Sequence, residues 1–296
     1  MKRRHTKRDL VRIFKERGLR ANRLLGQHFL VDHNVLEFIC KAGAVSEGDA
    51  VLEIGAGTGL LTWHLAQTGA RVLAVEIDGE LFDIARDYVG GAGNVVLVRA
   101  DIHGERRRLH PEVEAALRQT VGPGETFKVV SNLPYCISSD LLVTLLEMEG
   151  RVSMMVLTVQ KEFAARLVAR PGSRDYGALT VLLRAQAKVK RLRSLAPSVF
   201  WPVPNVESAI VEIVPDAERA ARISDYGLLR STVNALFSQR RKTAAKALAS
   251  TPRGRQSKQR IAEALRAAGV PPAARPGAIP IPKIVALANA LAAGPP

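Results

Sequence analysis

The glycine-rich segment VLEIGAGTGLLT, at residues 51–62, constrains the fold of this chain more than any other feature of its sequence. It opens with a short run of Val, Leu and Ile that is typical of a buried strand, and it ends in a helical pattern. Between them, Gly55, Gly57 and Gly59 let backbone amides approach a ligand closely. The segment therefore predicts a strand, a loop that binds a nucleotide-like ligand, and a helix.

The spacing of these glycines separates two kinds of ligand. A dinucleotide-binding loop has its third glycine at position 60, and this chain has Leu60 there. The spacing therefore argues against NAD and favours the GxGxG loop of methyltransferases that use S-adenosylmethionine.

Two acidic residues at the ends of the next strands support this cofactor. Glu76 ends the strand in VLAVEID and is placed to accept hydrogen bonds from ribose hydroxyls, and Asp101, in LVRAD, is placed to accept one from an adenine amino group. Carboxylates also suit a cofactor that carries a sulfonium cation. The alternative is that both are ordinary strand-end carboxylates.

Strand-like and helix-like stretches alternate from about Leu24 to Val214, which predicts an α/β, Rossmann-like fold with a parallel sheet. The expected strands are short and rich in Val, Ile and Leu: Ala50–Ile54, Arg71–Glu76, Val95–Arg99, Lys128–Ser131 and Ser153–Gln160. A surface helix is expected between the third and fourth of them, from the spacing of Val113, Ala116, Leu117 and Val121.

The later part of the chain gives weaker signals. Gly177–Val189 and Glu207–Val214 are placed to add a hairpin, although Ala178–Ala187 reads equally well as a helix. Beyond Pro215 the pattern is only helical, with helices expected at Tyr226–Ala249, Lys258–Ala268 and Lys283–Leu291.

The charge of the chain predicts a polyanionic partner, most simply a nucleic acid. The 296 residues include 43 Lys and Arg against 28 Asp and Glu, a net charge of +15. Residues 1–23 hold 10 basic and 2 acidic residues, residues 24–214 hold 19 and 22, and residues 215–296 hold 14 and 4. We therefore expect a basic N-terminal arm, a Rossmann-like methyltransferase domain and a small, all-helical RNA-binding domain with these bounds.

Several other classes are disfavoured. No apolar run reaches the length of a membrane span, and the N-terminus has no apolar core of a secretory signal. The two cysteines form no CxxC motif and the six histidines lack metal-ligand spacing, so neither a disulfide framework nor a metal site is expected. We expect a cytoplasmic protein that is a monomer and contacts no membrane.

Two basic segments are candidates for binding RNA. Arg240, Arg241, Lys242 and Lys246 are expected on one side of a helix whose inward face carries Leu229, Val233, Leu236 and Phe237. A solvated face is the usual explanation of such a run, but acidic partners are missing nearby, which favours contacts to an RNA backbone. The N-terminal arm has the pattern of a short helix that becomes ordered on RNA.

The segment Ser131-Asn132-Leu133-Pro134-Tyr135, at the end of the fourth strand, has the groups needed to hold an amino group on a planar base. An exocyclic adenine amine is a poor nucleophile because its lone pair is delocalised into the ring. Hydrogen bonds from its protons to the Asn132 oxygen and the Leu133 carbonyl would turn that lone pair toward a methyl group. Tyr135 is placed to stack on a base taken out of its helix. The alternative is a turn with a buried tyrosine.

With these motifs in place, the chain resembles the ribosomal RNA adenine dimethyltransferase family, and its small-subunit branch in particular. The resemblance runs from Leu25 to about Val214 and continues more loosely to the C-terminus. Seven segments fall in the family's order: LGQHFLVD (25–32), VLEIGAGTGLLT (51–62), VEID (75–78), NLPYCISS (132–139), QKEFAARLVARPGSRDYGALTV (160–181), FWPVPNVESAIV (200–211) and FSQRRKT (237–243).

The resemblance implies a site and a reaction. It implies that the cofactor is contacted by His28, Leu30, Gly55, Glu76, Asp101 and Asn132, and that the target adenine is held by Asn132, Leu133, Pro134, Tyr135 and Phe200. The family often has Asn at the position of His28, so either a main-chain or a side-chain contact is open there. For Trp201 we expect packing. The interval from Asp101 to Asn132 is longer than the family's, which leaves the role of Glu105–Thr126 open.

The implied activity is transfer of methyl groups from S-adenosylmethionine to two adjacent adenosines in the 3′-terminal hairpin of 16S rRNA. The implied partner is the small ribosomal subunit or its assembly intermediate, and the implied role is in ribosome biogenesis. One alternative is a 23S rRNA adenine methyltransferase of the macrolide-resistance type, which shares the glycine loop and NLPY. Another is a non-catalytic nucleic-acid-binding factor on the same fold, against which the acidic residues and NLPY argue.

Overall fold

The computed structural model describes residues 6–22, 26–105, 108–134, 139–148, 151–250 and 258–292. The chain divides into two compact units. The first, which we call the α/β unit, comprises Met1–Ala164 and Lys190–Val214, and the second, the helical unit, comprises Ala165–Val189 and Pro215–Pro296. Residues 165–189 thus belong with the helices, whereas the sequence pattern had placed them in the methyltransferase domain.

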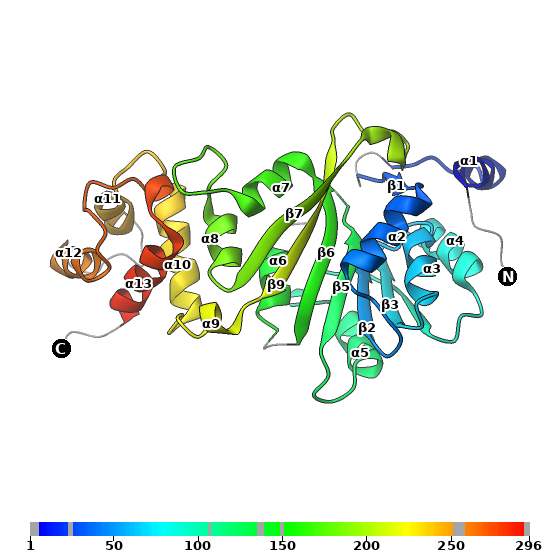
Figure 1. The fold of residues 1–296 in the computed structure, drawn as a ribbon, viewed down its shortest axis with the longest axis horizontal. Coiled ribbons are helices and arrows are strands. Elements are labelled where there is room, and N and C mark those ends of the chain that lie inside the picture. The colour runs from blue at the N-terminus through cyan, green and yellow to red at the C-terminus, as the bar shows by residue number, and fades with distance from the viewer. Residues whose placement is uncertain are drawn as a thin grey trace. The chain divides into compact units, whose positions relative to one another are not determined.

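The α/β unit is built on a seven-stranded sheet with the order β4-β3-β2-β5-β6-β9-β7 (Figure 1). The strands β2 to β6 are parallel and β9 runs antiparallel to β6. Their bounds are β2 (Ala50–Ile54), β3 (Arg71–Glu76), β4 (Val95–Arg99), β5 (Phe127–Asn132), β6 (Val152–Gln160), β7 (Ala187–Leu195) and β9 (Ser208–Pro215). The predicted α/β, Rossmann-like class is confirmed, and the five predicted strands match to within one residue at each end.

Helices connect the parallel strands in two directions. From β2 the chain runs outward through α3 and α4 to β4, and it then returns through α5 and α6 to the other side of β2. Because such crossovers are right-handed, α3 and α4 lie on one face of the sheet and α5 and α6 on the other. The bounds of these four helices are α3 (Leu60–Ala66), α4 (Gly79–Val89), α5 (Pro111–Thr120) and α6 (Ser139–Leu146). Helix α2 (His33–Ala42) precedes β2, and α7 (Lys161–Val168) follows β6.

This topology fixes where a ligand can bind. The strand order reverses between β2 and β5, and the carboxyl ends of β2, β3, β4 and β5 meet at the same edge of the sheet. Ligands of open α/β sheets bind outside the carboxyl ends of the strands at this reversal. The residues that follow these strands are therefore the ones to examine.

The N-terminal arm contains the short helix that its sequence predicts, and its ordering on RNA stays a prediction. Helix α1 (Lys7–Glu16) begins with a capping box between Thr6 and Asp9. Its Phe14 is 4% exposed and its ring lies 4.9 Å from that of Trp201. Burial of an aromatic side chain favours folding by about 2 kcal/mol, so this contact helps to hold α1 in place.

A short two-stranded sheet joins distant parts of the α/β unit. Strand β1 (Phe29–Leu30) pairs antiparallel with β8 (Phe200–Trp201), which follows the 3-10 turn η3 (Pro197–Val199). Trp201 packs against Phe29 and Phe14, so its predicted packing role is confirmed. The pairing holds residues 26–30 above the ends of the central strands.

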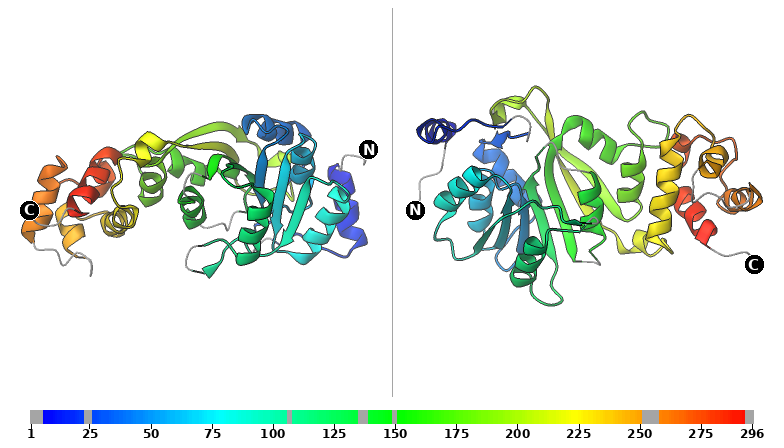
Figure 2. Two further views of the ribbon diagram at one scale, coloured as in Figure 1. Left: turned by 90° about the horizontal axis from the view of Figure 1, so that it is seen from below. Right: turned by 180° about the vertical axis from the view of Figure 1, so that it is seen from behind.

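The helical unit contains α8 (Ala178–Arg184), α9 (Ala217–Ala220), α10 (Tyr226–Ser238), α11 (Ala244–Ala249), α12 (Lys258–Ala267), the 3-10 turn η5 (Pro276–Ala278) and α13 (Ile281–Ala292). Helix α10 packs against α8, α11 and α13 (Figures 1 and 2). The single helix predicted at 226–249 is wrong, because a turn at residues 239–243 divides it. None of the helices in the described part of the chain combines the length and hydropathy that a membrane span requires.

Candidate active site

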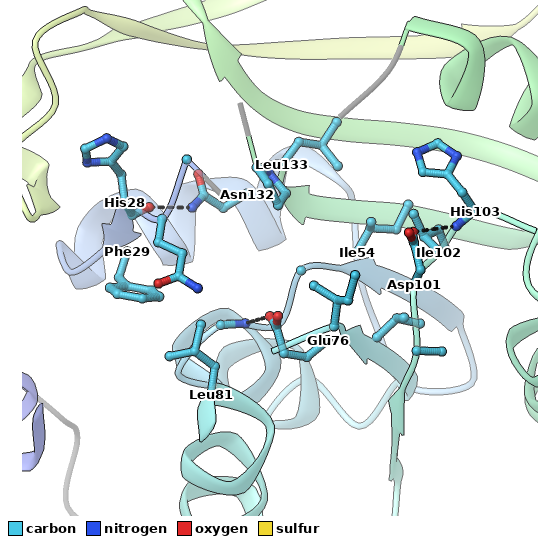
Figure 3. A pocket seen from close by; sticks show the side chains of 18 residues that line it. His28, Phe29, Ile54, Glu76, Leu81, Asp101, Ile102, His103, Asn132 and Leu133 are labelled. Atoms are coloured by element: carbon cyan, nitrogen blue, oxygen red, sulfur yellow. Dashed lines mark hydrogen bonds between the residues drawn. The ribbon is translucent and has the colours of Figure 1, made fainter. Parts of the chain in front are cut away.

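A pocket of about 310 Å³ lies at the carboxyl ends of the central strands (Figure 3). It is lined by residues that follow β2, β3, β4 and β5, together with residues 26–29. Of the predicted site residues, it brings together His28, Gly55, Gly57, Glu76, Asp101, Asn132, Leu133 and Pro134. Sites for cofactor-sized molecules begin at about this volume.

The glycine loop makes one wall of the pocket. Gly55 and Gly57 have φ angles of 78° and 57°, which side chains rarely adopt. A Cβ on Gly55 would lie 3.0 Å from the Pro134 ring, and one on Gly57 would lie 3.2 Å from the Phe29 ring. Both positions therefore require glycine, and the loop leaves its backbone open to a ligand.

Glu76 is held rigidly at the centre of the pocket. It is 6% exposed, and its two carboxylate oxygens accept hydrogen bonds from the backbone N–H groups of Gly57 (2.7 Å) and Asp78 (2.9 Å). Burial raises the pKa of the Glu76 carboxyl, and these two hydrogen bonds oppose that effect. The result is a fixed acceptor at the end of β3.

Asp101 lines the pocket next to Ile102 and His103 (Figure 3). Its side chain is exposed, and one oxygen accepts a hydrogen bond from the backbone N–H of His103 at 2.9 Å. The second oxygen of this carboxylate remains available to a donor on a ligand.

Asn132 is anchored by one half of its amide. Its Nδ2 donates to the main-chain oxygen of His28 at 3.1 Å (Figure 3). A carbonyl only accepts hydrogen bonds, so the atom that faces it has to be the amide nitrogen. This fixes the orientation of the amide and leaves the Asn132 Oδ1 as a hydrogen-bond acceptor in the pocket wall.

His28 contributes through its main chain. Its ring Nδ1 lies 2.7 Å from the carbonyl oxygen of Pro202, to which it has to donate. The ring is thereby turned toward the β8 segment, and the backbone carbonyl contacts Asn132. Contact of His28 with the cofactor stays a prediction, since the bonds seen here join its ring to Pro202 and its main chain to Asn132.

The remaining NLPY residues are only partly described. Leu133 and Pro134 line the pocket, and the Leu133 N–H donates to the Thr158 carbonyl at 3.1 Å. That bond ties the segment to the end of β6 and sets the position of the Leu133 carbonyl. Tyr135 lies outside the described residues.

The structure does not bring Leu30 and Phe200 to the pocket wall. They face each other across the β1–β8 pair, and they are 4% and 0% exposed. Both belong to the hydrophobic core of the α/β unit, with Phe29 and Phe14. Their side chains are therefore covered by other residues of this core.

The predicted RNA-binding residues lie in the helical unit and are exposed. Arg240, Arg241 and Lys242 occupy the turn between α10 and α11, and Lys246 lies on α11, so they do not share one helix face as expected. The Arg240 guanidinium donates to the main-chain oxygens of Arg174 (3.0 Å) and Tyr176 (2.8 Å). Arg240 thus fixes the turn, while the charged side chains of Arg241 and Lys242 are exposed to solvent.

The sequence reasoning missed Glu53, a buried acid next to the pocket. Glu53 is 1% exposed in β2, and burial raises its pKa to about 8, with the Thr62 hydroxyl lowering it and the Glu76 carboxylate raising it further. Its Oε2 has no hydrogen-bond partner among the described groups. The signal was present, because Glu53 interrupts the apolar run VLEI, where a charged residue is unusual.

Other missed residues form the apolar walls. Ile77 is 53% exposed directly after Glu76, and Ile102 follows Asp101. Gln27 also lines the pocket and donates from its Nε2 to Asp78 at 3.0 Å. A large apolar residue after each strand-end acid was the available signal. In the part of the chain that is described, no group of three or more His, Cys, Asp or Glu is placed to hold a metal ion.

The reversed strand order, the glycine loop and the carboxylates at the ends of β3 and β4 are those of a class, the α/β methyltransferases. Residues 18–274 match the family described as ribosomal RNA adenine dimethylase. The chain belongs to this family and is a methyltransferase of ribosomal RNA.

Individual relatives agree with this assignment. The chain is 42% identical to a probable ribosomal RNA small subunit methyltransferase A from Methanopyrus kandleri, over 78% of this chain and 77% of that protein. It is 37% identical to the ribosomal RNA small subunit methyltransferase A of Moorella thermoacetica, over 89% and 90%. A dimethyladenosine transferase from Plasmodium falciparum has the same fold, with a TM-score of 0.70 at 23% identity over 88% of this chain and 96% of that one.

Proposed function

We propose that this protein transfers methyl groups from S-adenosylmethionine to the exocyclic amines of two adjacent adenosines in the 3′-terminal hairpin of 16S rRNA. The relatives from Methanopyrus kandleri and Moorella thermoacetica are both named as ribosomal RNA small subunit methyltransferase A, and each match covers most of the chain. The substrate is the small ribosomal subunit or an assembly intermediate of it, and the protein acts in the cytoplasm as a monomer.

The observation that carries this proposal is the fixed amide of Asn132. Its nitrogen is engaged by the His28 carbonyl, so its Oδ1 can only act as an acceptor. An amine with two N–H groups is the complement of this oxygen and of the Leu133 carbonyl. Two such hydrogen bonds orient the amine without a general base, because a methylated amine loses its extra proton readily to solvent.

The described pocket suits S-adenosylmethionine. Glu76 would accept hydrogen bonds from the ribose hydroxyls, and Asp101 would accept one from the adenine amino group. Ile77 and Ile102 would lie against the adenine, and Gly55 and Gly57 would let the backbone approach the cofactor. When bound, this cofactor supplies an electrophilic methyl group on a sulfonium centre.

Recognition of the target base extends the same arrangement. Pro134 stiffens the segment that follows Asn132, and Tyr135 would stack on the flipped adenine. Phe200 is buried in the core, where it pairs with Leu30, and a direct contact with the base would require it to leave the core.

Affinity for RNA comes from the basic side chains of the helical unit. Arg241 and Lys242 would contact phosphates, with Lys246 beside them on α11 and Arg240 holding the turn. Each phosphate contact releases a counterion, which makes binding sensitive to salt.

Labelled S-adenosylmethionine and unmodified ribosomal subunits provide the test. We expect label in small-subunit rRNA when the protein is incubated with small and large subunits in separate reactions. Label in the large subunit alone would select the macrolide-resistance-type activity, and RNA binding without transfer to either subunit would select a non-catalytic factor.

A further inference from the structure

The helical unit contains a second cavity, of about 460 Å³, that the proposed chemistry does not use. Three arginines line it, namely Arg184, Arg219 and Arg222. Its apolar lining includes Ile281, Pro282, Val285 and Ala286, all from the beginning of α13. Among the described residues that line it, none is acidic.

The arginines are held in place by the backbone of the unit. Arg184 donates from its Nη1 to the Ala169 carbonyl at 2.6 Å, and Arg219 donates from its Nη1 to the Ala187 carbonyl at 2.9 Å. Each of these hydrogen bonds uses only one of the five N–H groups of a guanidinium. Arg184 and Arg219 are therefore held in place and keep further N–H groups that can donate to a ligand.

Neighbouring acids neutralise only part of the positive charge of this cavity. Asp216 is the acid paired with this group, and it is shared between Arg219 Nε and Lys188 Nζ, both at 3.3 Å. Burial lowers the pKa of Arg184, and repulsion by the Arg219 charge lowers it further. An anion in the cavity would relieve that repulsion.

Arg222 is the third arginine that lines the cavity. Its side chain is exposed and has no hydrogen bond or ion pair with any described group. Its backbone is fixed by Asn289 of α13, which donates from Nδ2 to the Arg222 carbonyl at 2.7 Å and accepts from the Ser224 N–H at 3.1 Å. Asn289 thus positions Arg222 without filling the cavity.

We propose that this cavity binds one nucleotide of a single-stranded RNA segment, with its phosphate on the three arginines and its sugar and base against the apolar side of α13. A free phosphate would use the arginines alone, whereas a nucleotide uses both sides. The proposal rests on the proposed function and adds a second RNA contact to it.

The position of the cavity supports an extended RNA contact. Arg222 precedes α10 and Arg241 follows it, so the two basic sites lie at opposite ends of this helix (Figure 1). The helix has 13 residues, which corresponds to a length of about 20 Å. One RNA strand that runs along α10 would reach both.

The test compares two pairs of variants in the full-length protein, with a short fluorescein-labelled oligouridylate as the probe. Arg222→Glu reverses a charge at the cavity, and Arg266→Glu makes the same change at an exposed position on α12. Ala286→Trp adds a large side chain to the apolar lining, and Ala267→Trp makes the same change at an exposed position at the end of α12. None of these four side chains has a hydrogen bond or ion pair with a described group, which limits effects on folding.

We expect Arg222→Glu to weaken RNA binding about tenfold and to reduce the salt slope by about one, and Ala286→Trp to weaken binding several-fold. The two controls should bind like the unmodified protein. If Arg222→Glu binds like Arg266→Glu, or Ala286→Trp like Ala267→Trp, the cavity is not an RNA site. Methyl transfer by the unmodified protein is measured in parallel, so a failure of the proposed function is seen separately from a failure of this inference.

Discussion

The two units of this chain differ most in charge. The α/β unit contains 24 Lys and Arg and 23 Asp and Glu, a net charge of +1, even though it includes the basic arm. The helical unit contains 19 and 5, a net charge of +14. Nearly all of the +15 of the chain therefore belongs to the unit that lacks the glycine loop.

This difference indicates a division of labour. The α/β unit has a pocket with fixed hydrogen-bond acceptors, which suits a cationic cofactor and an amine. The helical unit has two clusters of cations, which suit phosphates. If the division holds, substitutions in the first should change the transfer rate or cofactor affinity, and substitutions in the second should change RNA affinity and its dependence on salt.

The largest effect is expected from Asn132→Ala. Removal of the fixed Oδ1 leaves the amine without its orienting acceptor, so the rate of methyl transfer should fall on the order of 100-fold or more, while RNA affinity stays nearly unchanged. Single-turnover transfer and RNA binding are the measurements. Asn34→Ala, at an exposed position on α2, is the matched control. A comparable loss of RNA affinity in Asn132→Ala would contradict the separation of methyl transfer and RNA binding between the two units.

Gly57→Ala should weaken cofactor binding about tenfold, a loss of about 1.4 kcal/mol. The added Cβ would lie 3.2 Å from the Phe29 ring, so the loop or the ring has to move into the pocket. Gly91→Ala is the control, since Gly91 also has a positive φ but open space around it. Backbone strain affects both variants, so equal cofactor affinities in calorimetry would argue against a loop that contacts the cofactor.

The double substitution of Arg241 and Lys242 by Ala should lower the slope of log affinity against log salt by about two. Its thermal unfolding should stay unchanged, because these exposed side chains have no hydrogen bond or ion pair with described groups. Arg240→Ala should instead lower the unfolding temperature, because Arg240 binds two backbone carbonyls. Unchanged salt slopes in the double variant would remove this turn from the RNA contact.

The smallest effect concerns Glu53 and pH. Its pKa is about 8 in the folded protein and near 4.5 when unfolded, so the folded state retains a proton between these values and stability falls as pH rises through this window. Glu53→Gln should remove this slope, so its stability relative to the unmodified protein should rise by about 1.4 kcal/mol for each pH unit within the window. Denaturant unfolding at pH 5 and pH 8 measures it, with the exposed Glu47→Gln as control. Parallel pH profiles for the two variants would contradict the raised pKa.

Much of the fold was predictable because buried parallel strands have a simple signature. Ala50–Ile54, Arg71–Glu76 and Val95–Arg99 are short, mostly apolar runs bounded by polar or glycine-rich loops, and the structure has them with these bounds. The pocket residues Gly55, Glu76, Asp101 and Asn132 followed from the same pattern, since each stands at the carboxyl end of a parallel strand.

What escaped prediction depends on contacts between distant parts of the sequence. The apolar spacing of 226–249 continues through residue 239, and the turn there is fixed by Arg240 reaching Tyr176 and by the Ala244 N–H donating to the Ala274 carbonyl. Phe200 is buried because it pairs with Leu30, a partner 170 positions away in the sequence. No local pattern indicates either contact.

The most direct test of the account is the number and position of methyl groups on the rRNA. Unmodified small subunits are incubated with the protein and S-adenosylmethionine, and fragments of the 3′-terminal hairpin are analysed by mass spectrometry. The account predicts two methyl groups on each of two adjacent adenosines, and none with Asn132→Ala. Methyl groups on another type of nucleotide, or no methylation in this hairpin, would contradict it.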